Sequence, residues 1–250
     1  MKNERGIKMV ILYEVHDNLY VNMTNKCPCA CTFCLRQTRD EMNHSGSLWL
    51  EREPSVEEVK NEFSKFDMNK YKEVVFCGFG EPTERLDDVL EVCRFIKDKY
   101  NKTIRINTNG LADLIHKKNT APMFDGLIDI VSISLNTPNK ERYLELTRSK
   151  FGIESFDAMI TFAENVKHYV KEVVLSTVST TLTEEEICKK AAECGIRLMG
   201  IREHYIHTPP EGRPVLLLGY GKPDEQEIQK GLEVLESIIT GRNSNNCKKP

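Results

Sequence analysis

Short apolar segments alternate with amphipathic segments along most of the chain. Runs rich in Val, Ile and Phe predict strands, and the stretches between them carry apolar residues at helical spacing. This alternation is typical of βαβ units, whose strands are parallel and whose crossovers are right-handed. The predicted strands lie in segments 19–24, 73–79, 103–110, 128–136, 172–180 and 196–206.

Helix signals fall between these strands. Ser55 and Glu58 form a capping-box pattern that predicts a helix to about Phe66, and residues 86–100 place their apolar positions on one helical face. Residues 11–24 predict a hairpin, whereas the Pro- and Gly-rich segment 207–223 predicts no regular element. Further helices are expected at 139–148, 156–169, from 183 onward and at about 224–239.

Six strands joined in order by helical connections predict an α/β fold, a partial (β/α)6 TIM-like barrel. A short N-terminal hairpin would precede it and a C-terminal helical extension would follow. We expect a single domain over residues 1–250, with the core barrel at about 19–206 and the extension at about 207–250. Parallel strands bring their carboxyl ends to one rim, where the chemistry of such barrels is found.

Composition narrows the classes of function. The 250 residues include 40% hydrophobic and 29% charged residues, enough for one sizeable core. A net charge of -3 gives no overall basic field that would favour nucleic acid or an anionic membrane as a partner. The apolar run near the amino terminus is too short for a secretory or spanning segment, so we expect a cytoplasmic protein.

The cysteines are concentrated in one segment. Four of the nine lie between Cys27 and Cys34, a density typical of metal binding in a reducing compartment rather than of disulfides. Cys27, Cys31 and Cys34 form the pattern C-x3-C-x2-C directly after a predicted strand. Three thiolates on such a loop can hold three irons of a cubane cluster and leave the fourth iron open. Cys29 offers a fourth thiolate, so a zinc site and an electron-transfer cluster are alternatives.

With Phe33 before its last cysteine, the loop resembles the C-x3-C-x-aromatic-C hallmark of the radical S-adenosylmethionine (radical SAM) superfamily. The resemblance implies a 4Fe-4S cluster on Cys27, Cys31 and Cys34, with S-adenosylmethionine bound at the fourth iron. It implies an oxidoreductase-type enzyme that cleaves this cofactor reductively to a 5'-deoxyadenosyl radical, which abstracts hydrogen from an unknown substrate. A donor such as flavodoxin or ferredoxin would supply the electron. Cys29 stays unassigned, because the family's ligands are the other three.

Later motifs resemble the cofactor cradle of the same family. The turn Gly78-Phe79-Gly80-Glu81-Pro82 is similar to its GGEP motif, with Phe79 departing from the pattern, and its glycines would let the backbone approach a ligand. Residues 107–110 are similar to its TNG segment. Ser132, Ser134 and Asn136 alternate along one predicted strand and so share a face. The resemblance implies that the cofactor contacts Phe33, Gly78, Phe79, Gly80, Glu81, Asn107, Asn109, Ser134, Asn136 and Ile201.

The substrate end is less defined. Arg202, His207 and Arg213 fall near the end of the last predicted strand, where they are candidates to bind an anionic substrate or are solvated surface residues. Segment 41–54, which contains Trp49, is a candidate lid or a segment that packs over the cysteine loop. The pattern identifies no catalytic acid or base. The remaining cysteines are scattered, so a second cluster is not expected.

The amino-acid sequence around the cysteines resembles one branch of the superfamily more than others. TNKCPCACTFCLRQTRD followed by SLWLEREPSVEEV looks most like a branch of the superfamily described as associated with TatD-type nucleases. That description records a neighbour and implies no reaction. The single cluster and compact barrel are also similar to activases that install a glycyl radical on a partner enzyme. Small-molecule, peptide and protein substrates therefore stay open.

Overall fold

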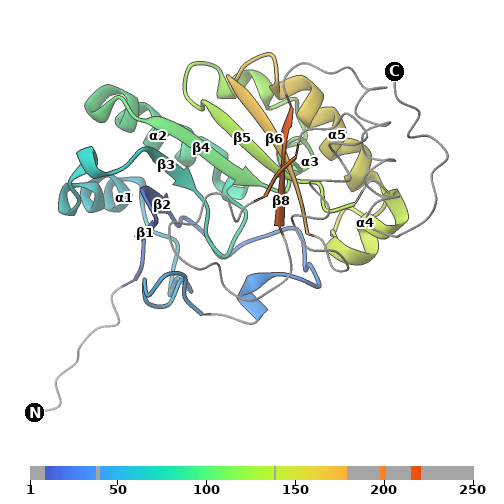
Figure 1. Ribbon diagram of the computed structural model, residues 1–250, viewed down its shortest axis with the longest axis horizontal. Coiled ribbons are helices and arrows are strands. Elements are labelled where there is room, and N and C mark those ends of the chain that lie inside the picture. Colours follow the sequence, from blue (N-terminus) through green and yellow to red (C-terminus); the bar gives the residue numbers. More distant parts are fainter. Residues whose placement is uncertain (1–8, 38–39, 138, 179–197, 201–214, 221–250) are drawn as a thin grey trace, which may run out of the picture.

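The computed structural model describes residues 9–37, 40–137, 139–178, 198–200 and 215–220, which form one mixed sheet with helices against it (Figure 1). The strand order is β1-β2-β3-β4-β5-β6-β8-β7. The strands are β1 (Leu12–Val15), β2 (Asn18–Val21), β3 (Glu73–Phe76), β4 (Thr103–Thr108), β5 (Ile130–Ser134), β6 (Glu172–Val178), β7 (Leu198–Gly200) and β8 (Val215–Tyr220).

Helices connect the strands much as the sequence predicts. The α-helices are α1 (Val56–Glu62), α2 (Leu86–Tyr100), α3 (Ala112–His116), α4 (Lys140–Thr147) and α5 (Glu154–Val166). Shorter 3-10 helices are η1 (Leu35–Gln37), η2 (Phe63–Lys65), η3 (Met68–Lys70), η4 (Pro82–Arg85) and η5 (Ala121–Phe124). The capping box is confirmed, because Ser55 Oγ accepts from Glu58 N and the Glu58 carboxylate accepts from Ser55 N.

The predicted α/β class and the N-terminal hairpin are confirmed. β1 and β2 are antiparallel, and β2 to β6 run parallel in sequence order. This arrangement is consistent with a partial TIM-like barrel. The predicted C-terminal helices lie outside the described residues.

The far edge of the sheet differs from the prediction. The sixth predicted strand, β7, does not pair with β6; β8 lies between them and is antiparallel to both. The prediction that segment 207–223 contains no regular element is therefore wrong. Apart from Gly219, which lies within β8, its Pro and Gly residues flank the apolar run that forms the strand, and a short apolar run bounded by turn residues is itself a strand signal.

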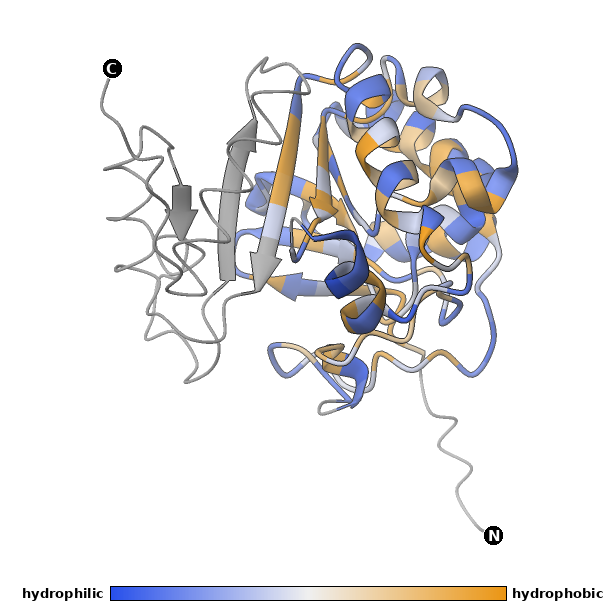
Figure 2. Cartoon of the chain, turned by 90° about the vertical axis from the view of Figure 1, so that its right-hand side faces the viewer, coloured by the Kyte–Doolittle hydropathy of each residue, from blue (hydrophilic) through white to orange (hydrophobic). Residues whose placement is uncertain are grey.

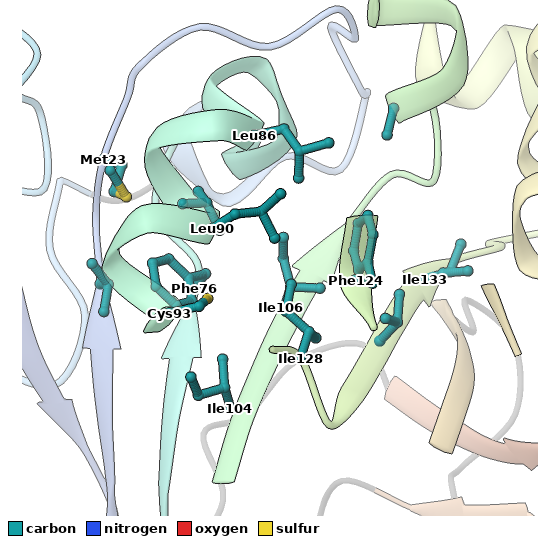
Figure 3. Close-up of a cluster of buried hydrophobic side chains, with 14 of the residues drawn as sticks. Met23, Phe76, Leu86, Leu90, Cys93, Ile104, Ile106, Phe124, Ile128 and Ile133 are labelled. Atoms are coloured by element: carbon teal, nitrogen blue, oxygen red, sulfur yellow. The ribbon is translucent and has the colours of Figure 1, made fainter. Parts of the chain in front are cut away.

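Alternation along the parallel strands separates a helix-facing core from a polar inner face. Residues that point toward the helices are almost fully buried, among them Phe76, Ile104, Ile106 and Ile133, and they pack with side chains of α2 such as Leu90 (Figure 3). Hydrophobic residues are gathered where the helices meet the sheet (Figure 2). The opposite face presents Arg105 and two register pairs of polar residues, Asn107 with Ser132 and Ser134 with Ser176.

Asp129 ties the amino ends of three strands together. Its carboxylate accepts from Ile104 N at 2.8 Å and forms ion pairs with Lys97 and Lys171, while its backbone oxygen accepts from Lys171 N and Glu172 N. Burial acts to raise the pKa of Asp129, but the hydrogen bonds from the two lysines and from Ile104 outweigh it and lower the pKa. The carboxylate is therefore held in its charged form in the folded protein.

Candidate functional site

The cysteine loop, residues 27–34, follows β2 and is fixed by backbone hydrogen bonds to the carboxyl end of α4. Ala30 N donates to Thr147 O at 2.9 Å and Thr32 N donates to Leu146 O at 2.8 Å. The last carbonyls of a helix have no partner within the helix, so the loop supplies the donors that they require. On its other side Lys150 N donates to Pro28 O at 2.8 Å. The fold thus specifies the path of the loop without a ligand.

The thiols of the loop face one another. Cys29 is only 4% exposed, and its side chain hydrogen-bonds with those of Cys27 and Cys31. These hydrogen bonds lower the pKa of Cys27 and Cys31 and raise that of Cys29, whereas burial raises the pKa of Cys34. The thiolate is the form that binds a metal, and the thiols of the loop lie close enough to shift one another's pKa.

The thiols of Cys27, Cys31 and Cys34 are a donor set that fits an iron-sulfur cluster. Within the described part of the chain, no three His, Cys, Asp or Glu side chains are grouped so that they could hold one metal ion. A cubane cluster places each thiolate on a different iron, so its ligands stand further apart than those of a zinc ion. Cys27, Cys31 and Cys34 are all partly exposed, which leaves them accessible to a cluster.

The turn after β3 lies against the segment that leads into the cysteine loop, and Gly80 makes this contact possible. A Cβ at Gly80 would lie 2.2 Å from Thr24 O and 2.6 Å from Lys26 O. The neighbouring Glu81 N donates to Lys26 O at 2.7 Å. A Cβ at Gly78 would lie 2.1 Å from Asn22 Oδ1. In this structure the glycines let the turn approach residues 22–26 of the chain.

Glu81 joins this turn to the turn after β4. It is 4% exposed, and Oε1 accepts from Thr83 N at 3.1 Å, from Thr83 Oγ1 at 2.7 Å and from Thr108 Oγ1 at 2.7 Å. Oε2 accepts from Asn109 N at 2.8 Å. Burial raises the pKa of Glu81, although these hydrogen bonds oppose the shift. Both oxygens are engaged by the protein, so Glu81 fixes the relative positions of the two turns.

The end of β4 directs two asparagine side chains toward thiols. Asn109 Nδ2 lies 4.0 Å from Cys27 Sγ and 3.8 Å from Cys29 Sγ. Asn107 hydrogen-bonds with the side chain of Cys77, and its Oδ1 is buried with no hydrogen-bond partner. A buried acceptor without a partner is costly, and an amine or hydroxyl of a bound ligand would satisfy it. Asn107 therefore fits a cofactor site on the inner face.

β5 supplies the serines of the inner face. Ser132 is 8% exposed and pairs in register with Asn107, and Ser134 pairs with Ser176. Asn136 lies beyond the end of β5 with φ of 64°, and its Nδ2 donates to Ser134 O at 3.2 Å. The predicted alternation thus places the two serines together but does not extend to Asn136, because the chain has left the strand.

Segment 41–54 packs against residues 22–26, which lead into the cysteine loop, and against the turn after β3. Asn25 and Leu50 exchange two hydrogen bonds, from Asn25 Nδ2 to Leu50 O and from Leu50 N to Asn25 Oδ1. Trp49 is 40% exposed and meets the buried Phe79 edge-on, with ring centroids 5.1 Å apart. These contacts support a packing role for the segment. Phe33 is half-buried beside the thiols.

Comparison with known families decides what the loop and its flanking turns belong to. The family model of the radical SAM superfamily matches residues 21–189, which include the cysteine loop and both turns. The chain belongs to the radical SAM superfamily. Enzymes of this superfamily use a 4Fe-4S cluster and S-adenosylmethionine, the two cofactors that the sequence implies. The narrower resemblances to the TatD-associated branch and to activases stay predictions.

Curated relatives within the superfamily have more than one activity in their names. The chain is 34% identical over 140 residues to a probable GTP 3',8-cyclase of Methanocaldococcus jannaschii, covering 54% of this chain and 41% of the relative. It is 28% identical over 232 residues to a probable GTP 3',8-cyclase of Sulfurisphaera tokodaii, covering 90% and 64%. It is 26% identical over 150 residues to a probable dual-specificity RNA methyltransferase of Protochlamydia amoebophila, covering 56% and 38%.

The chain therefore spans 38% to 64% of the length of these curated relatives. Among solved structures, a radical SAM methyltransferase from Sphaerobacter thermophilus matches with a TM-score of 0.48 and 16% identity, covering 91% of this chain and 66% of that one. In the described part of the chain, no helix combines the length and the apolar character needed to cross a membrane.

Several predicted residues of this radical SAM chain lie outside the described residues. They are the adenine candidate Ile201 and the substrate candidates Arg202, His207 and Arg213. The described part of the predicted site comprises the cysteine loop, the turns after β3 and β4, and the serines of β5.

One residue that sequence analysis missed is Arg36. Its Nη2 donates to Cys29 O at 3.3 Å and its Nη1 donates to Asn25 O at 3.5 Å, so it holds the two sides of the loop together. Its positive charge also lowers the pKa of Cys27 and Cys31. The sequence signal for this role is the position of Arg36, two residues after Cys34, because a cationic neighbour favours the thiolate form of a cysteine.

Proposed function

We propose that Cys27, Cys31 and Cys34 hold a 4Fe-4S cluster whose fourth iron binds S-adenosylmethionine. The observation that carries this proposal is the loop itself: these cysteines lie on a backbone pinned to α4, and Asn109 from the turn after β4 approaches the sulfur of Cys27. When bound and reduced, the cluster supplies the electron that cleaves the cofactor to methionine and a 5'-deoxyadenosyl radical. A donor such as flavodoxin or ferredoxin would provide that electron.

The chain's own residues then bind and orient the cofactor. The turn at residues 78–81 would lie along its methionyl end, held in place by the hydrogen bonds of Glu81 to Thr108 and Asn109. Asn107 and the serines of β5 supply polar groups on the inner face. The Asn107 Oδ1, which has no hydrogen-bond partner among the described residues, would accept a hydrogen bond from the cofactor. Preorganised groups of this kind position a reactive cofactor and exclude water.

The substrate stays unassigned in this proposal. The names of the curated relatives indicate GTP cyclisation in some and RNA methylation in another, and the chain spans only part of each. The proposed reaction therefore ends with hydrogen abstraction from an unidentified substrate.

Formation of 5'-deoxyadenosine tests the proposal. The full chain is reconstituted anaerobically with iron and sulfide, reduced with dithionite and incubated with S-adenosylmethionine. We expect 5'-deoxyadenosine and methionine in equal amounts, measured by chromatography and mass spectrometry, and neither product when dithionite is omitted. A fully assembled cluster that yields no 5'-deoxyadenosine would contradict the proposal.

A further inference from the structure

The side chain of Asn109 is directed at the cysteine loop and not at the open inner face. Its Nδ2 lies 4.0 Å from Cys27 Sγ and 3.8 Å from Cys29 Sγ, within the longer range of hydrogen bonds to sulfur. Asn109 is part of the turn after β4, 82 residues from Cys27 in the sequence. The contact is thus built by the fold rather than by the loop.

One hydrogen bond fixes which end of the Asn109 amide faces the sulfurs, and two more hold the turn that carries it. Asn109 Oδ1 accepts from Leu111 N at 3.0 Å, so the oxygen is turned toward its own turn and the NH2 group toward the thiols. Asn109 N donates to Glu81 Oε2 at 2.8 Å. Glu81 is held in turn by Thr108 Oγ1 at 2.7 Å. The amide oxygen is thus engaged by Leu111 N, and the N–H groups face the sulfurs of Cys27 and Cys29.

An N–H group directed at a cluster ligand changes the energy of reduction. Reduction adds one negative charge, which is spread over the irons, the sulfides and the cysteine sulfurs. A donor to a ligand sulfur stabilises this more negative state more than the oxidised state, so it raises the reduction potential. A carboxylate or an aliphatic side chain at the same place would not.

We propose that Asn109 donates a hydrogen bond to the Cys27 thiolate and thereby raises the reduction potential of the cluster. This inference rests on the proposed ligation by Cys27. It gives Asn109 a role toward the cluster, distinct from the contact with S-adenosylmethionine that the family resemblance implies. Asn109 affects reduction of the cluster through its hydrogen bond to Cys27, and it does not itself contact the substrate.

The test is a redox titration of the full reconstituted chain without S-adenosylmethionine, followed by electron paramagnetic resonance of the reduced cluster. In Asn109→Leu the equilibrium constant for reduction should fall threefold to tenfold, which is a midpoint shift of about 28 to 59 mV to lower potential. Asn109→Asp keeps the side chain's shape and an acceptor for Leu111 N while replacing the donor with an acceptor. Its midpoint should fall at least as far, and it serves as the test if Asn109→Leu folds poorly.

Asn107→Leu is the matched control. Asn107 lies two residues earlier, on β4, and contacts the thiol of Cys77, which is not a predicted ligand, so the midpoint of this variant without S-adenosylmethionine should match the wild type. An unchanged midpoint in Asn109→Asp with an intact cluster would overturn the inference, as would an equal shift in Asn107→Leu. Failure of the wild-type chain to assemble a cluster would instead refute the proposed function.

Discussion

Replacing Cys27, Cys31 or Cys34 with alanine should each abolish assembly of the cluster. Each thiolate is expected to bind a different iron. Backbone hydrogen bonds hold the loop in place, so no other side chain is expected to replace a missing thiolate. Iron and sulfide bound per chain after anaerobic reconstitution should fall from nearly four of each to a small fraction. The expected change is thus close to complete loss.

Cys29→Ala is the matched control within the same loop. Its thiol is buried and hydrogen-bonded to Cys27 and Cys31, and it lies outside the C-x3-C-x2-C spacing of the three proposed ligands. The variant should bind iron and sulfide at wild-type levels. If Cys29→Ala lost the cluster while one of the other three variants still assembled it, Cys29 would be a ligand in place of the cysteine replaced in that variant.

Gly80→Ala should unfold the region that leads into the cysteine loop, although it adds only one methyl group. The new Cβ would lie 2.2 Å from Thr24 O and 2.6 Å from Lys26 O, and both contacts are with backbone. Relieving them would break the 2.7 Å hydrogen bond from Glu81 N to Lys26 O, next to Cys27. We expect a loss of about 3 kcal/mol in the free energy of unfolding, measured by urea denaturation, together with poor cluster incorporation.

Gly78→Ala provides the comparison for this effect. Its Cβ would meet Asn22 Oδ1 at 2.1 Å, which is the end of a side chain whose oxygen has no hydrogen-bond partner. The Cβ would also lie 2.8 Å from Asn22 Cγ, and the buried Asn22 amide donates to Val10 O and Leu48 O. Moving this side chain would break those hydrogen bonds, so we expect a loss of about 2 kcal/mol. Equal stability of Gly80→Ala and the wild type would show that the turn does not press against residues 24–26 as described.

Local patterns were sufficient to predict most of the fold. The capping box at Ser55 and the apolar face of residues 86–100 each predicted an observed helix, because these signals depend on near neighbours in the sequence. The parallel strands were predicted for the same reason. β8 was missed because the proline and glycine residues around it suggested an irregular segment, and its pairing with β6 is a long-range contact.

The candidate site divides in the same way. The spacing of Cys27, Cys31 and Cys34 is a local pattern that can be recognised in the sequence, and so is the alternation of Ser132 and Ser134. The role of Glu81 is not, because it depends on Thr108 and Asn109, which lie 27 and 28 residues away. The same holds for Gly80, whose missing side chain makes room for the backbone of Thr24 and Lys26.

The central claim is that three cysteine ligands leave one iron of the cluster open. Electron paramagnetic resonance of the reduced cluster tests this claim most directly. The reconstituted chain is reduced with dithionite, and spectra are recorded before and after addition of S-adenosylmethionine. We predict a change in the g-values when the cofactor binds to the fourth iron, and the same change in Cys29→Ala. Identical spectra with and without the cofactor would contradict the account and indicate an electron-transfer cluster.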